Sequence, residues 1–146
     1  MVSISRKYET LQAVDVNSII NESLKELEKF IIELNQRQLY DKGEIDVTDP
    51  GIKEFYAKGT IRQKQKKAMF KKTDFITLRW DGAFYESFKL IIFDKTFVIS
   101  ATDLKWVNWL EPNPRFANAL GLTEESKGEL REIMLPVFLR KLKDEI

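Results

Sequence analysis

The chain has 146 residues and a net charge of +1, because its 24 basic side chains are almost balanced by 23 acidic ones. This length, with 43% hydrophobic residues, fits one globular domain with a real core. The near-neutral charge favours neither nucleic acid nor an anionic membrane as a general partner. No apolar run approaches the roughly 20 residues that span a bilayer.

The chain contains no histidine and no cysteine, which excludes several kinds of chemistry. Catalysis by Ser-His-Asp or Cys-His groups is not available, and neither is a zinc site built from Cys and His. The lack of disulfides fits production in the cytosol. The chemistry that remains is that of carboxylate pairs and carboxylate metal sites.

The N-terminal part predicts an arm followed by one long helix. Residues 1–16 are mixed in polarity and predict an arm, with a short strand near Val2–Ile4. Asn17 fits a helix cap, and the apolar stripe behind it predicts a helix over roughly 18–41 that Gly43 ends. The stripe consists of Ile20, Leu24, Leu27, Ile31 and Leu34.

The segment 58–72 is strongly basic, with seven Lys and Arg side chains and no acid. Helical spacing of its less polar residues predicts a short helix. Only one aromatic residue, Phe70, lies in it, so stacking on bases has little support. Three interpretations stay open: a solvated helix face, a contact with an acidic protein, and a nucleic-acid contact.

The middle of the chain predicts strands. From Phe75 the hydrophobic period changes to two, which predicts a strand over 75–80. Asp81-Gly82 then predicts either a hairpin corner or the start of a short helix. Two runs rich in β-branched and aromatic residues, Phe88–Phe93 and Thr96–Ser100, enclose a two-residue turn and predict a β-hairpin.

The C-terminal part predicts two helices. Thr102 fits the cap of a short helix that carries Trp106 and Trp109, and Thr123 fits the cap of the last helix. Pro136 predicts a kink in that helix or the start of a new one.

The order of these elements predicts the α+β class. We expect a single domain over residues 1–146, in which a long N-terminal helix and a C-terminal helix pack on a small antiparallel sheet of about three strands. No internal repeat or flexible linker divides the chain.

Carboxylates near aromatic residues, Asp81, Glu86 and Asp94, are the only catalytic candidates. General acid–base catalysis needs two of them facing one pocket, and helix-cap and turn roles are favoured for Asp81 and Asp94. A second acidic group lacks the spacing of a calcium loop and fits a solvated loop better. We therefore predict no enzyme activity, no cofactor and no metal site. The second group consists of Asp41, Glu44, Asp46 and Asp49.

Five stretches carry a resemblance to a known family. They are LNQRQLYDKG (34–43), LRWDGAFYESFKL (78–90), IFDKTFVISATDLKW (92–106), FANALGLTEES (116–126) and LREIMLPVFLRKL (130–142). The series resembles small proteins from the structural-gene blocks of tailed phages and prophages of gut bacteria, similar to virion-morphogenesis and tail-completion proteins of the head–tail neck. Two boxes depart from the pattern, since Trp80-Asp81-Gly82 replaces Asp-Thr-Gly and Ala119-Leu120-Gly121 replaces Phe-Gly.

The resemblance implies a structural protein of the virion without enzyme activity. It implies a homo-oligomeric ring that contacts the portal or adjacent neck and tail proteins, non-specific contact with packaged DNA, and no membrane. The expected location is the neck or tail of the virion, with assembly in the host cytoplasm. The ring stoichiometry and the identity of the contacted neighbours are left open.

Seven residues are the predicted contacts with partners, lysines for charge docking and aromatic residues as buried anchors. For the two tryptophans a core position is the favoured alternative. The hairpin 88–100 and the N-terminal arm are the expected adhesive edges. Two rival functions are a small nucleic-acid-binding module that uses segment 58–72 and a carboxylate-dependent hydrolase. The predicted contacts are Lys64, Lys66, Lys67, Phe84, Tyr85, Trp106 and Trp109.

Overall fold

The computed structural model describes residues 4–146 and confirms the α+β class. The helices are α1 (Ile4–Ala13), α2 (Val16–Glu26), α3 (Glu28–Tyr40), α4 (Lys58–Lys67), α5 (Ala83–Glu86), the π-helical turn η1 (Trp106–Leu110) and α6 (Glu124–Glu145). The strands are β1 (Phe88–Phe93) and β2 (Thr96–Ala101).

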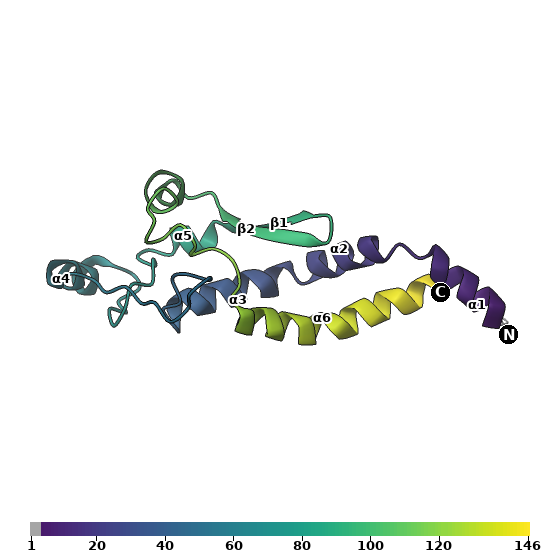
Figure 1. Ribbon diagram of the computed structural model, residues 1–146. Coiled ribbons are helices and arrows are strands. Elements are labelled where there is room, and N and C mark those ends of the chain that lie inside the picture. Colours follow the sequence, from purple (N-terminus) through teal and green to yellow (C-terminus); the bar gives the residue numbers. More distant parts are fainter. Residues whose placement is uncertain (1–3) are drawn as a thin grey trace.

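The molecule is elongated, with α2 and α3 running end to end along its middle (Figure 1). The hairpin of β1 and β2 lies on one side of α2, and α6 lies on the other. Helix α4 occupies one end of the molecule, whereas α1 and the C-terminus share the opposite end. The termini of the chain therefore lie far from the basic segment.

The predicted long N-terminal helix is divided in two. It begins at Val16, because the side chain of Asp15 accepts a hydrogen bond from the amide of Ser18, so the cap at Asn17 was wrong. Leu27 interrupts it with φ −95° and ψ 11° and separates α2 from α3. The expected arm is mostly helical as α1; of the predicted strand, Ile4 begins α1 and the other residues lie outside the described part.

The strand predicted over 75–80 is absent, and the described residues form a two-stranded sheet. Leu78 has φ +59°, a left-handed conformation that an extended strand does not accommodate. The segment is instead held by scattered backbone bonds, including those from Ile76 to Glu54 and from Phe70 to Trp80. Residues 75–78 are buried without pairing to a strand, and the hydrophobic period of two therefore led to a wrong strand prediction.

The predicted hairpin is confirmed in position and register. The antiparallel pairs run from Phe88–Ala101 to Phe93–Thr96 and leave Asp94-Lys95 as the turn, where Lys95 adopts φ +61°. One face of the hairpin packs towards α2 and α3, and the alternate side chains point outward. The hairpin thus presents a second face that the rest of the chain does not cover.

The structure confirms two of the predicted helix starts in the second half of the chain and corrects a third. Asp81-Gly82 starts the short helix α5, with Gly82 at φ +91° and the Asp81 carboxylate accepting from the amide of Ala83. Thr123 caps α6 as predicted, since its hydroxyl oxygen accepts from the amide of Ser126. Asp103, and not Thr102, accepts the capping bond before η1.

Helix α6 continues through Pro136 without interruption. The missing amide of a proline costs a helix one hydrogen bond and bends it, and Pro136 lies on the exposed side of α6. Figure 1 shows the second half of α6 turning away from the line of its first half. The predicted kink is therefore a gentle bend within one helix.

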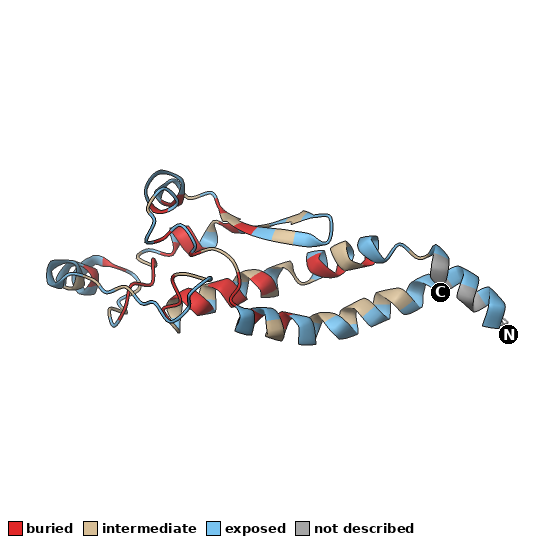
Figure 2. Ribbon diagram, viewed as in Figure 1, coloured by how far each residue is buried: buried red, intermediate tan, exposed pale blue. Residues whose placement is uncertain are grey.

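Burial is concentrated in one half of the molecule (Figure 2). Residues of α3, α5, the base of the hairpin and the first turns of α6 form the core, whereas the tip of the hairpin, the end of α6 and α1 are largely exposed. The core is made of aliphatic and aromatic side chains that lie between Leu24 and Leu130 in the sequence. Its most completely buried members include Ile31, Leu34, Leu39, Ile45, Tyr85 and Ala119.

Two amide side chains of α3 connect the core to the loop before α6. The amide nitrogen of Asn35 donates to the carbonyl of Ala119, and its oxygen accepts from the amide of Gly121. Gln38 repeats the pattern, donating to the carbonyl of Gly121 and accepting from the amide of Thr123. Both side chains are fully buried, so their bonds satisfy backbone groups that water cannot reach.

We predict that Gln38→Ala lowers the free energy of unfolding by about 2–4 kcal/mol, because it leaves the Gly121 carbonyl and the Thr123 amide buried without partners. Denaturant unfolding measures the change. The matched control is Gln63→Ala, an exposed position of α4 where little loss is expected. Equal stability of the two variants would contradict this role of Gln38.

Candidate interaction surfaces

The structure divides the seven predicted contact residues into two groups. Lys66, Lys67 and Trp109 are exposed, Trp109 by 74%. The remaining four are buried and cannot meet a partner in the folded chain, so they are corrected to core positions. They are Lys64, Phe84, Tyr85 and Trp106.

The three buried aromatic residues belong to one cluster. The ring of Phe84 stacks on Trp106 at 5.7 Å and meets the edges of Tyr85 and Phe88. Trp106 thus follows the core alternative of the sequence analysis. The Tyr85 hydroxyl donates to the Thr77 carbonyl, and burial raises the pKa of Tyr85 well above its ordinary value.

Lys64 is the most unexpected of the four, because its side chain has no exposed surface. Its ammonium donates to the Tyr56 hydroxyl at 3.1 Å, the Thr77 hydroxyl at 3.1 Å and the Lys72 carbonyl at 2.6 Å. It also lies 4.8 Å from the centre of the Tyr56 ring. An ammonium has three donors, and here all three are used within the protein, which attaches α4 to the irregular segment beside it.

The same network affects Tyr56. Burial raises the pKa of this phenol, but hydrogen bonds from Thr77 and Lys64 outweigh burial and hold the pKa below its ordinary value. The amide of Thr77 donates to the Tyr56 oxygen as well. Tyr56 and Lys64 together therefore form a buried polar centre whose members are satisfied by one another.

The exposed cations of α4 form a stripe. Lys58, Arg62 and Lys66 are spaced by four residues, and all three are exposed. Like charges at this spacing repel each other on one helix face, and segment 58–72 has no acid to offset them. An anionic partner would relieve that repulsion.

Two long exposed surfaces are apolar. On the outer face of the hairpin, Ile91 and Phe93 of β1 and Val98 of β2 are open to solvent, with Phe93 exposed by 53%. On α6, Leu135 and Leu139 are exposed by 57% and 44%. A third, shorter patch surrounds η1. It consists of Leu104, Val107 and Trp109.

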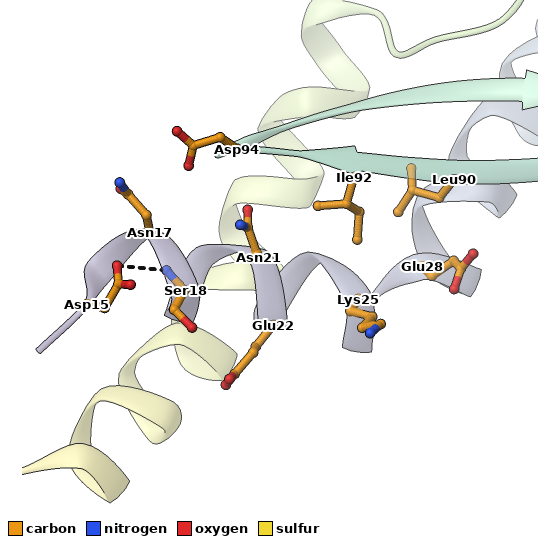
Figure 3. Close-up of a pocket in the computed structure, with 10 residues that line it drawn as sticks. All are labelled: Asp15, Asn17, Ser18, Asn21, Glu22, Lys25, Glu28, Leu90, Ile92 and Asp94. Carbon is orange, nitrogen blue, oxygen red and sulfur yellow. Dashed lines mark hydrogen bonds between the residues drawn. The ribbon is translucent and has the colours of Figure 1, made fainter.

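A groove of about 760 Å³ lies between α2 and β1. Its hairpin side is apolar, with Leu90 and Ile92 pointing towards α2, whereas its α2 side is polar (Figure 3). Asn21 of α2 accepts a hydrogen bond from the amide of Lys95, which connects the hairpin turn to this helix. The hairpin and α2 therefore meet at the turn but leave an open groove between Leu90, Ile92 and the helix.

The groove contains acids, but they do not converge. Asp15 caps α2, and the carboxylates of Glu22, Glu28 and Asp94 point in different directions (Figure 3). Of the three catalytic candidates, Asp94 lines the groove, while Asp81 is occupied at the start of α5. Asp81 and Glu86 lie at the two ends of the short helix α5, whereas Asp94 lies at the hairpin turn, separated from them by the length of β1.

The acidic loop after α3 also shows no metal geometry. Asp46 accepts from the amide and hydroxyl of Thr48, and these bonds lower its pKa. Glu44 is buried, one of its oxygens lacks a hydrogen-bond partner, and burial raises its pKa. Within residues 4–146, no cluster of three or more acidic side chains is arranged to hold a metal ion.

No helix in the described part of the chain combines the length and the apolar character needed to cross a bilayer. No protein-family model, curated protein or solved structure matches this chain.

We predict that Lys64→Ala lowers the free energy of unfolding by about 2–4 kcal/mol, since it removes buried packing and leaves the Lys72 carbonyl without its donor. Thermal unfolding monitored by circular dichroism measures the loss. Lys66→Ala, two positions along the same helix and exposed, is the control and is expected to change stability little. A surface role for Lys64 would make the two variants alike.

We predict that Glu44→Gln stabilises the protein at pH 7 and has no such effect near pH 3. Since burial raises the pKa of Glu44 above 4.5, the folded state holds the proton more tightly than the unfolded state. The wild type thus loses stability as the pH rises through this range. The glutamine variant does not, because its side chain has no carboxyl proton to lose. Unfolding curves at several pH values measure the effect, with exposed Glu22→Gln as control; a pH-independent difference would contradict it.

Proposed function

We propose that this chain is a structural assembly subunit that works through the surfaces it offers to copies of itself and to neighbouring proteins. The observation that carries the proposal is that the outer face of the hairpin and the stripe of Leu135 and Leu139 on α6 expose large apolar side chains, in addition to the apolar inner sides that the chain covers. Exposed apolar surfaces of this extent mark interaction sites.

The proposal is more specific where the sequence resemblance adds to it. We propose a virion protein of the head–tail junction of a tailed phage, a ring component that docks to the portal or to adjacent neck and tail proteins. The first and fourth of the resembling boxes meet in the interior of the chain, where Gln38 bonds to Gly121 and Thr123. Among the exposed positions, Trp109 is the best placed to anchor a different protein, since Trp is enriched in binding hot spots.

Two measurements test the proposal. Sedimentation velocity over a wide range of concentration is expected to show discrete oligomers of the purified chain, alone or upon addition of purified portal. Mass spectrometry of purified phage particles is expected to detect the chain at a fixed ratio to the portal. A strictly monomeric chain that is absent from particles would refute the proposal.

A nucleic-acid contact through segment 58–72 is the second candidate, favoured by the exposed stripe of Lys58, Arg62 and Lys66. The burial of Lys64 removes one cation from the predicted contact, so the usable charge is smaller than the sequence suggests. An exposed helix face without acids still suits a phosphate backbone.

We predict that the chain binds duplex DNA weakly at low salt if this candidate is right, and that affinity falls steeply as salt rises because counterions are released. The variant Lys58→Gln/Arg62→Gln/Lys66→Gln is expected to lower the slope of log affinity against log salt by about 2–3, since each lost phosphate contact contributes about 0.9. Fluorescence anisotropy measures both. Removal of three exposed cations elsewhere, Lys25, Lys29 and Lys127, is the control.

A further inference from the structure

We propose that copies of this chain join back to front, with the outer face of the hairpin of one copy packed on the outer stripe of α6 of the next. This inference rests on the proposed assembly function and names the surfaces that carry it. The outer face of the hairpin consists of Lys89, Ile91, Phe93 and Val98, and the outer stripe of α6 consists of Glu132, Leu135, Leu139 and Lys143.

The two surfaces lie on opposite sides of the molecule. Helix α2 packs against β1 on one side and against α6 on the other, so the hairpin, α2 and α6 form three successive layers (Figure 1). The outer face of the hairpin and the outer stripe of α6 therefore point in opposite directions. One copy cannot bring them together, but the next copy can.

Both surfaces expose large apolar side chains on elements that are also apolar on their inner side. On α6, Met134, Val137, Phe138 and Leu142 are half-buried on the inner side, while Leu135 and Leu139 are exposed on the outer side. These two leucines thus form an apolar stripe on a helix surface that is otherwise mostly charged. The hairpin is likewise apolar on both faces, and an isolated two-stranded sheet is only marginally stable in water.

The two surfaces match in size. The six residues of β1 extend over about 20 Å, and α6 from Glu132 to the C-terminus extends over about 22 Å. Two strands about 4.8 Å apart present a face comparable in width with a helix of about 10 Å diameter. A single helix thus covers the outer face of the hairpin.

Their charges are complementary at the end nearer the core. On the hairpin, Lys89 lies on the outer face near the start of β1 and is followed on that face by Ile91 and Phe93. On α6, Glu132 is followed on the same stripe by Leu135 and Leu139 at i+3 and i+7. When the apolar residues of the two surfaces are aligned, Glu132 of one copy therefore meets Lys89 of the next.

The direction of the elements agrees with this pairing. Both β1 and α6 run from the core end of the molecule towards the end that holds the C-terminus (Figure 1). Copies stacked in the same orientation bring Glu132 near Lys89 without inversion of either element. Because the two surfaces differ, each copy keeps one free surface of each kind, and repetition gives a closed ring or an open filament.

Cysteine crosslinking tests the contact cleanly, because the chain has no cysteine of its own. The variants are Lys89→Cys, Glu132→Cys and the double variant, treated with a short bis-maleimide. We expect a mixture of the two single variants to form crosslinked dimers, and the double variant to form a ladder of multimers. Thr48→Cys, an exposed position outside both surfaces, replaces Lys89→Cys in the control mixture and is expected to give no dimer with Glu132→Cys.

Sedimentation of the same samples separates the two ways to fail. Crosslinked dimers of either single variant alone would overturn back-to-front packing. So would oligomers of the mixed single variants that give no crosslink. Both outcomes leave the assembly function intact. A chain that stays monomeric at every concentration would overturn both.

Charge exchange provides a second readout that does not depend on crosslinking. Lys89→Glu and Glu132→Lys are each expected to weaken association about fivefold, the effect of one exposed ion pair. The double variant Lys89→Glu/Glu132→Lys is expected to recover the wild-type association constant, whereas additive losses would overturn the pairing. Lys53→Glu, an exposed position in the irregular segment before α4, is the control and leaves association unchanged.

Discussion

The fold depends on the amide side chains of α3, which replace the backbone pairing that a larger sheet would provide. Asn35 and Gln38 each satisfy one donor and one acceptor of the loop before α6, and Gln36 donates to the carbonyl of Tyr85 in α5. An amide offers both a donor and an acceptor in a fixed arrangement, so it pairs with a backbone segment much as a strand does. The irregular part of the chain is thereby ordered around one helix.

This dependence explains the character of the resembling boxes. Asn35 and Gln38 lie in the first box, Tyr85 in the second, and Ala119, Gly121 and Thr123 in the fourth. The boxes meet in the interior, where they define how α3, α5 and α6 fit together. These residues therefore define how the interior packs, whereas the proposed contact surfaces involve other side chains, on the outer sides of the hairpin and α6.

Features set by neighbours in the sequence could be predicted, and features set by distant partners could not. The hairpin, the Thr123 cap and the helical basic segment follow from short-range spacing and turn chemistry, and all three are confirmed. The burial of Lys64 depends on acceptors from Tyr56, Lys72 and Thr77, which nothing in the basic run indicates. Phe84 and Tyr85 were similarly predicted to be anchors for partners, because composition does not distinguish a buried ring from an exposed one.

The uneven distribution of the core has a thermodynamic consequence. The half of the molecule around α3 is densely buried, while the hairpin tip and the end of α6 retain exposed apolar surface (Figure 2). Regions with few buried contacts open locally at low free-energy cost, and binding to the folded form alone stabilises it by mass action. Neighbouring subunits would then act as ligands for one another's least ordered half, and resistance to unfolding would increase with protein concentration.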